Sequence, residues 1–107
     1  MKIRNFTGKT LRIKNAETGK ELVFEAEGKV HINYTYTPEM TIDEVPILGE
    51  RTGIVVDLPE KEEGTFIVIP WTLKPTPELW ERDDLLTAPI ANSEETSKEI
   101  ICTFLEK

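Results

Sequence analysis

A short polar cluster follows the second of two tryptophans in the chain. Arg82, Asp83 and Asp84 come directly after the segment that holds Trp71 and Trp80. An arginine offers a planar fork to phosphate or carboxylate, a tryptophan stacks on a base, and an aspartate accepts hydrogen bonds from ribose hydroxyls or exocyclic amines. These five residues therefore predict a binding site for a small polar ligand. In the structural alternative, Arg82 pairs with Asp83 or Asp84 at the end of a helix, and the tryptophans are core or lid residues.

The common catalytic signatures are absent from the sequence. It has no glycine-rich phosphate loop, no nucleophile elbow, no His-Glu helix motif and no calcium loop. The single histidine, His31, has no second histidine with which to form a metal pair, and the single cysteine, Cys102, lies in an apolar strand-like run that favours a core position. We therefore predict a protein that is not an enzyme and that holds no cofactor or metal. A small metal-dependent hydrolase that uses Asp83 and Asp84 is the enzymatic alternative.

Length and charge restrict the class of protein further. The 107 residues are 38% hydrophobic and 31% charged, which predicts one folded domain over 1–107. The net charge of -7 argues against binding to DNA, RNA or acidic membranes. No apolar run approaches the roughly 18 residues of a membrane span, and the first residues do not resemble a signal peptide, so we expect a cytoplasmic protein.

The charge is unevenly distributed along the chain. Residues 1–29 contain seven Lys or Arg against four acids, whereas the remainder is strongly acidic. The basic side chains of residues 1–29 either bind a small anion or form ion pairs with the acidic remainder of the chain. We expect the ion pairs.

Alternating apolar residues predict a β-hairpin over 10–26 around a turn at 16–19. In the register that places charges opposite each other, Lys14 faces Glu21, Ile13 faces Leu22 and Leu11 faces Phe24. A third strand is expected over 30–36, because apolar and polar residues alternate there and the β-propensity is high.

The rest of the chain predicts further short strands and one irregular region. Prolines and glycines favour a long loop over 38–53 with a short strand near 45–48, whereas the apolar runs 54–56 and 66–69 are typical of central strands covered on both faces. A short helix is plausible over 76–82, and a last strand over 99–105. The predicted fold is mainly β, a small antiparallel sandwich or open barrel of about six to eight short strands with at most one short helix.

Several motifs, taken in order, resemble a family of small uncharacterised phage, prophage and bacterial proteins. Those proteins open with N-L-T-P-H, carry L-P-E-P before G-T-I-Y-I-V-S, and continue into R-D-D-L-V-x-P. The corresponding segments here are Asn5-Phe6-Thr7, Leu58-Pro59-Glu60, Gly64 to Ile69 and Arg82-Asp83-Asp84-Leu85. Departures from the pattern occur at three positions, Gly8, Lys9 and Pro70.

The resemblance implies a protein of phage or prophage type that acts inside a bacterial cell. Proteins of this setting include virion components, regulators and counter-defence proteins that sequester nucleotide immune signals. The leading hypothesis is thus a non-enzymatic binding protein that sequesters a nucleotide-derived signal, such as a cyclic nucleotide or a cyclic ADP-ribose-like molecule. The alternative is a phage structural or protein-interaction module that binds a host or virion protein. A homo-oligomer is expected, because subunits of this size form deep pockets mainly between copies.

Overall fold

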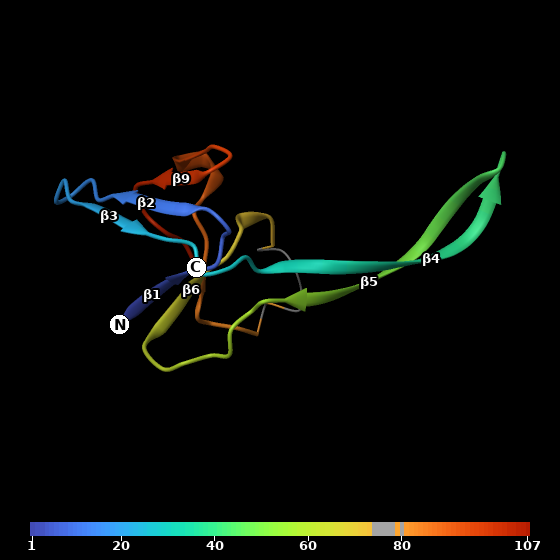
Figure 1. Ribbon diagram of the computed structural model, residues 1–107, viewed down its shortest axis with the longest axis horizontal. Coiled ribbons are helices and arrows are strands. Elements are labelled where there is room, and N and C mark those ends of the chain that lie inside the picture. The colour runs from blue at the N-terminus through green and yellow to red at the C-terminus, as the bar shows by residue number, and fades with distance from the viewer. Residues whose placement is uncertain (74–78, 80) are drawn as a thin grey trace.

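The computed structural model describes residues 1–73, 79 and 81–107, and this part of the chain is mainly β, as predicted (Figure 1). Its nine strands form three open sheets, accompanied by two short 3-10 turns, η1 (Trp71–Leu73) and η3 (Ile90–Asn92), and no α-helix is found among the described residues. The helix expected over 76–82 falls largely outside them. Within the described part, no helix is long and apolar enough to cross a membrane.

A three-stranded parallel sheet forms the centre of the molecule. Its order is β1 (Lys2–Asn5), β6 (Thr65–Val68) and β7 (Leu85–Leu86). Strand β6 is a run of β-branched and aromatic residues, and it occupies the middle of the sheet with apolar side chains buried on both faces. The prediction of a covered central strand at 66–69 is confirmed for this segment.

A four-stranded sheet packs against the first. Its order is β3 (Glu21–Phe24), β2 (Thr10–Lys14), β9 (Glu99–Cys102) and β8 (Ser93–Glu95). The register of the β2–β3 hairpin is the predicted one, with Leu11 opposite Phe24 and Lys14 opposite Glu21. Strand β9 runs parallel to β2 and ends at Cys102, earlier than the predicted boundary at 105.

Two apolar clusters lie on the two sides of β6. One joins the two sheets and includes Leu11, Val68, Ile100 and Cys102. The other includes Phe6, Val30, Ile67, Ile69 and Leu79. Cys102 is therefore a core side chain, as expected, and burial raises the pKa of its thiol.

The third sheet is a long hairpin that projects from the rest of the molecule (Figure 1). Its strands are β4 (His31–Ile42) and β5 (Val45–Val56), and we call residues 31–56 the arm and the other described residues the body. The arm accounts for the elongated dimensions of the molecule, 59 × 30 × 20 Å. Asp43 and Glu44 form its turn with φ angles of 49° and 68°, the sign that a two-residue type I′ turn requires.

The arm corrects two predictions. The expected loop over 38–53 is wrong, because both strands continue through this region with register shifts between Thr37 and Pro38 and between Pro38 and Met40. The strand at 54–56 is present, but it is not covered on both faces, since the side chain of Ile54 is 65% exposed. An uninterrupted apolar run normally indicates burial, but in a two-stranded sheet no second layer is available to provide it.

Candidate functional site

The predicted ligand site contains an ion pair between two of its members. Arg82 donates from Nε to Oδ1 of Asp84 and from Nη2 to Oδ2, each at 2.8 Å, and Nη2 also lies 3.1 Å from the carbonyl oxygen of Pro59. Asp84 is only 4% exposed. Its hydrogen bonds to Arg82 lower the pKa of its carboxyl group, and the same bonds raise the pKa of the guanidinium. The ion pair of the structural alternative is thus present, and it links the loop before β6 to the start of β7.

Asp83 has a different partner and a different environment. Its carboxylate forms an ion pair with Lys61, which lowers its pKa, and its side chain is 73% exposed. The two neighbouring aspartates therefore do not converge on one point. Each already has a cationic partner from its own chain, and a ligand-binding role for Arg82, Asp83 and Asp84 stays a prediction.

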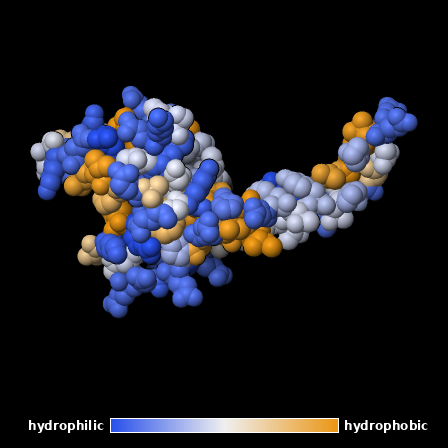
Figure 2. Space-filling view, viewed as in Figure 1, coloured by the Kyte–Doolittle hydropathy of each residue, from blue (hydrophilic) through white to orange (hydrophobic). Residues whose placement is uncertain are grey.

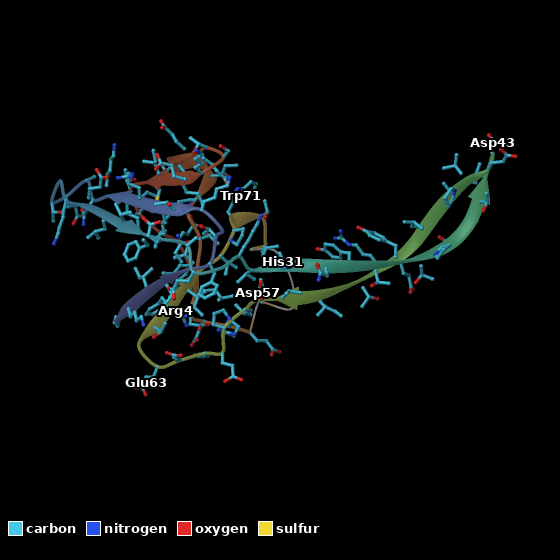
Figure 3. All side chains as sticks on the ribbon, in the orientation of Figure 1. Arg4, His31, Asp43, Asp57, Glu63 and Trp71 are labelled. Carbon is cyan, nitrogen blue, oxygen red and sulfur yellow. The ribbon has the colours of Figure 1, made fainter. Side chains whose placement is uncertain are left out.

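Trp71 lines a small pocket elsewhere on the body. The pocket has a volume of about 160 Å³. It is lined by Trp71, by its neighbours in sequence and by residues from other parts of the chain: Thr7, Lys9, Lys29, Ile69, Pro70, Thr72, Ala88, Glu95 and Ile100. Figure 3 shows Trp71 on the side of the body from which the arm emerges. Arg82, Asp83 and Asp84 do not line this pocket, so the structure does not bring Trp71 together with them. The other tryptophan of the prediction, Trp80, lies outside the described residues.

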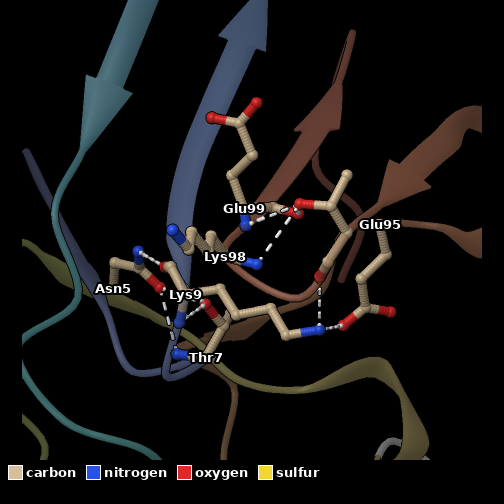
Figure 4. A network of polar contacts seen from close by, with 7 residues as sticks. Asn5, Thr7, Lys9, Glu95, Lys98 and Glu99 are labelled. Atoms are coloured by element: carbon tan, nitrogen blue, oxygen red, sulfur yellow. Dashed lines mark hydrogen bonds and ion pairs between the residues drawn. The ribbon is translucent and has the colours of Figure 1, made fainter.

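A polar network holds the pocket residues Thr7 and Lys9 in place (Figure 4). Asn5 is fully buried, and its amide donates to the carbonyl oxygens of Lys9 at 2.7 Å and Phe24 at 2.8 Å. Its Oδ1 accepts the backbone N–H of Thr7 at 3.0 Å, an Asx-type turn. The ammonium of Lys9 donates to Glu95 and to the carbonyl oxygen of Thr96, both at 2.8 Å. Asn5 is therefore a positioning residue for the lining residues Thr7 and Lys9.

Two of the three departures from the resembled pattern line this pocket. Lys9 and Pro70 are lining residues, and Gly8 lies against the side chain of the lining residue Lys29. Sequence reasoning did not place Thr7, Lys29 or Glu95 at a site. No sequence pattern indicated that positions 9 and 95 meet, because they are far apart in the chain.

The arm carries a second candidate surface. Beyond the register shifts, Met40 pairs with Ile47 and Ile42 pairs with Val45. Paired residues share a face and alternate residues return to it, so these four side chains lie together on one face of the arm. We call residues 38–50 the arm tip. Figure 2 shows hydrophobic residues near the end of the arm, and the exposed large apolar residues of the tip are Met40, Ile42, Val45, Ile47 and Leu48.

Charge and backbone chemistry further define the arm tip. It contains four acids, Glu39, Asp43, Glu44 and Glu50, and no basic residue. The β4–β5 sheet has no third strand in the described part of the chain, so the outer edges of both strands are open. An apolar face rimmed by carboxylates suits a partner surface that is apolar at its centre and basic at its rim.

Comparisons with known proteins give no identification. The chain matches no protein-family model, no curated protein and no solved structure. Among the described residues, no group of three or more histidine, cysteine, aspartate or glutamate side chains is arranged to hold a metal ion.

Proposed function

We propose that this protein is a non-enzymatic binding module that engages a protein partner through its arm. The observation that carries the proposal is the exposed apolar face of the arm tip. Contiguous apolar surface on a soluble protein marks interaction sites, and a two-stranded hairpin is at best marginally stable in water without a covering layer. A partner that covers this face supplies the missing layer.

The environment of the arginine cluster also favours a protein partner over the nucleotide sponge. Arg82 and Asp84 form a hydrogen-bonded ion pair in which Asp84 is buried, so a ligand that replaces either partner has to break this pair. Breaking a buried pair is costly, because it leaves a charge without its partner. The arm requires no such rearrangement.

The resemblance to phage and prophage proteins supports the biological setting of this proposal. In that setting the partner is a host protein or a virion protein inside the bacterial cytoplasm. The binding module then belongs either to an assembly or to a complex that blocks a host component.

Site-specific photocrosslinking in the producing bacterium tests the proposal. A benzophenone amino acid replaces Met40 or Leu48 on the arm tip, and a control replaces Ile90, which is 61% exposed on the body. We expect protein adducts of defined mass from the two arm positions and none from Ile90. The absence of adducts from both arm positions in a folded, expressed protein would overturn the proposal.

The Trp71 pocket supports a second candidate function, the sequestration of a small anionic ligand. It offers an aromatic residue that is 40% exposed and the ammonium group of Lys29. Its volume of about 160 Å³ is similar to that of an engineered cavity that holds one benzene ring, so it suits a single ring or a small anion rather than a whole dinucleotide.

Isothermal titration with inorganic phosphate and cyclic mononucleotides, which can place a small anion or a single ring in the pocket, tests this second candidate, and cyclic ADP-ribose isomers serve as larger comparison ligands. If it is correct, at least one ligand releases heat, Trp71→Ala abolishes binding and Arg82→Ala leaves binding unchanged. The opposite sensitivity would assign the ligand to the arginine cluster. No heat from any ligand removes the candidate.

A further inference from the structure

A groove lies at the end of the body away from the arm. It has a volume of about 490 Å³ and runs between the β2–β3 turn and the segment after β9. Figure 1 shows the β2–β3 turn at one extreme of the molecule and the arm tip at the other. Most of the lining is apolar, and Phe104 is half exposed there; the apolar lining residues are Ile3, Ile13, Ala16, Leu86, Phe104 and Leu105.

This end of the body also carries basic side chains without an ion-pair partner. Of the seven basic residues in positions 1–29, Arg4 pairs with Glu27, Arg12 with Glu21 and Glu99, and Lys9 with Glu95. The other four have no ion pair among the described residues, and two of them adjoin groove-lining segments in sequence: Lys2 precedes Ile3, and Lys20 follows the β2–β3 turn. A third, Lys14, lies opposite Glu21 and helps to lower the pKa of that carboxyl group. The groove lining includes one acid, Glu17.

We infer that the arm tip of one copy occupies this groove in a second copy of the chain. The inference rests on the proposed function, and it identifies the protein partner of the arm as a second copy of this chain. The tip offers two pairs of apolar side chains in a segment with four acids and no basic residue, and the groove offers an apolar floor at the end of the body where Lys2 and Lys20 have no ion pair among the described residues. One chain thus provides both halves of a complementary interface, in apolar character and in charge.

Contact between tips is disfavoured by the same charges. Each tip carries four acids and no basic residue, so two tips placed face to face repel. Edge-to-edge pairing of two tips is also opposed by Pro38 in β4 and by Pro46 in β5, because proline has no backbone N–H to contribute to a ladder. The interface is therefore between unlike surfaces.

A contact between unlike surfaces at opposite ends of a molecule repeats from copy to copy. Such heterologous contacts generate a ring if the rotation closes and a filament if it does not. The structure thus predicts assemblies larger than a dimer, which grow with protein concentration.

Sedimentation velocity and native mass spectrometry of the full chain test this inference. Samples from about 1 to about 100 µM cover the range of moderate affinities. The tip variant is Ile42→Asp, the groove variants are Phe104→Asp and Ala16→Trp, and the matched control is Ile90→Asp on another exposed isoleucine. Circular dichroism confirms that each variant is folded, and the two groove variants act by different means, one by charge and one by filling the groove.

We expect the wild-type chain and Ile90→Asp to form higher oligomers alike. Ile42→Asp and the groove variants should weaken association about 100-fold or more, since an unpaired charge is then buried or the groove is filled. A mixture of Ile42→Asp with Phe104→Asp is the most specific test. The first variant retains a groove and the second retains a tip, so together they should form a heterodimer and nothing larger.

Three results would overturn the inference: a wild-type chain that is monomeric over the whole range, assembly that both groove variants leave intact, or a mixture that forms no heterodimer. Crosslinks from the arm to a different protein, together with a monomeric wild-type chain, would retain the proposed function and reject a second copy as the partner. The absence of any arm crosslink rejects the proposed function itself.

Discussion

The body and the arm are built from the same kind of β-forming sequence, yet they differ in what covers their apolar residues. In the body, Val68 of β6 is fully buried between two sheets. In the arm, Ile42 is 52% exposed and Ile54 even more so. β-propensity is therefore sufficient to form strands, whereas the stability of a sheet depends on the layer that packs on it.

The arm has some internal support of its own. The ring of Tyr34 lies against Gly53 on the opposite strand, where an added Cβ would come within 3.0 Å of the ring. The guanidinium of Arg51 stacks over the same ring, 4.5 Å from its centroid. An aromatic residue that covers a cross-strand glycine and a cation that covers the aromatic residue replace part of the missing layer.

The largest expected difference between the two regions comes from cavity formation. Leu11 is completely buried in the body, so Leu11→Ala should lower the free energy of unfolding by about 3 kcal/mol. Ile42→Ala on the arm should change it by less than about 0.5 kcal/mol in dilute, monomeric protein. Urea unfolding measures both, followed by tryptophan fluorescence for the body and by tyrosine absorbance for the arm. Equal losses would show that the arm is as well covered as the body.

The ion pairs of the body give the next largest effect. Asp84→Asn leaves Arg82 without its carboxylate in a partly buried position and should cost about 2 kcal/mol at neutral pH. The matched control is Asp83→Asn, which breaks an exposed pair with Lys61 and should cost almost nothing. Similar costs for the two variants would contradict the assignment of Asp84 as the structural partner.

The cost of Asp84→Asn should also depend on pH. The folded state lowers the pKa of Asp84, so its contribution is complete above the unfolded value of about 4 and is lost as the pH falls through the lower folded pKa. The difference in stability between the wild-type chain and the variant should therefore begin to shrink as the pH falls below about 4, and it should continue to shrink through the lower folded pKa. A difference that stays constant down to pH 2 would exclude ionised Asp84 as the cause.

The arm turn gives a smaller effect in the opposite direction. Asp43 and Glu44 adopt positive φ angles, which asparagine and glycine adopt at lower cost. Replacing them by Asn-Gly should stabilise the hairpin by about 1 kcal/mol and slow amide hydrogen exchange in the arm about fivefold. The body amides serve as the internal control. Unchanged exchange in the arm would show that the turn does not limit its opening.

The smallest expected effect is that of the cation over Tyr34. Arg51→Ala should cost about 0.5 kcal/mol, which corresponds to roughly twofold faster exchange of the neighbouring arm amides. Arg51→Lys keeps the charge but not the planar stacking, and an intermediate value is expected. If Arg51→Ala and the wild-type chain exchange at the same rate, the contact contributes nothing to the stability of the arm.

Local features of the fold could be predicted from the sequence. The β2–β3 hairpin could be placed in its register because Leu11 and Phe24, and Lys14 and Glu21, are matched across a short turn. The ion pair of Arg82 with Asp84 was also foreseeable as an alternative, since its members are two residues apart. Both cases depend on contacts that are close in sequence.

Other features could not be predicted, for two physical reasons. Proline and glycine normally interrupt strands and therefore predict a loop over 38–53, but in a sheet with only edge strands Pro38 and Pro46 are tolerated. Contacts between distant residues leave no local pattern, and this conceals the parallel pairing of β2 with β9 and the bond from Lys9 to Glu95. The Trp71 pocket depends on such contacts.

The distribution of aromatic residues makes the two regions separately observable by optical spectroscopy. Both tyrosines of the chain, Tyr34 and Tyr36, are on the arm, with ring centroids 6.3 Å apart, whereas neither tryptophan is in residues 31–56. Tyrosine absorbance therefore reports solvent access along the arm, and tryptophan emission reports the remainder of the chain. Opening of the arm and unfolding of the body should appear as two signals in one unlabelled sample.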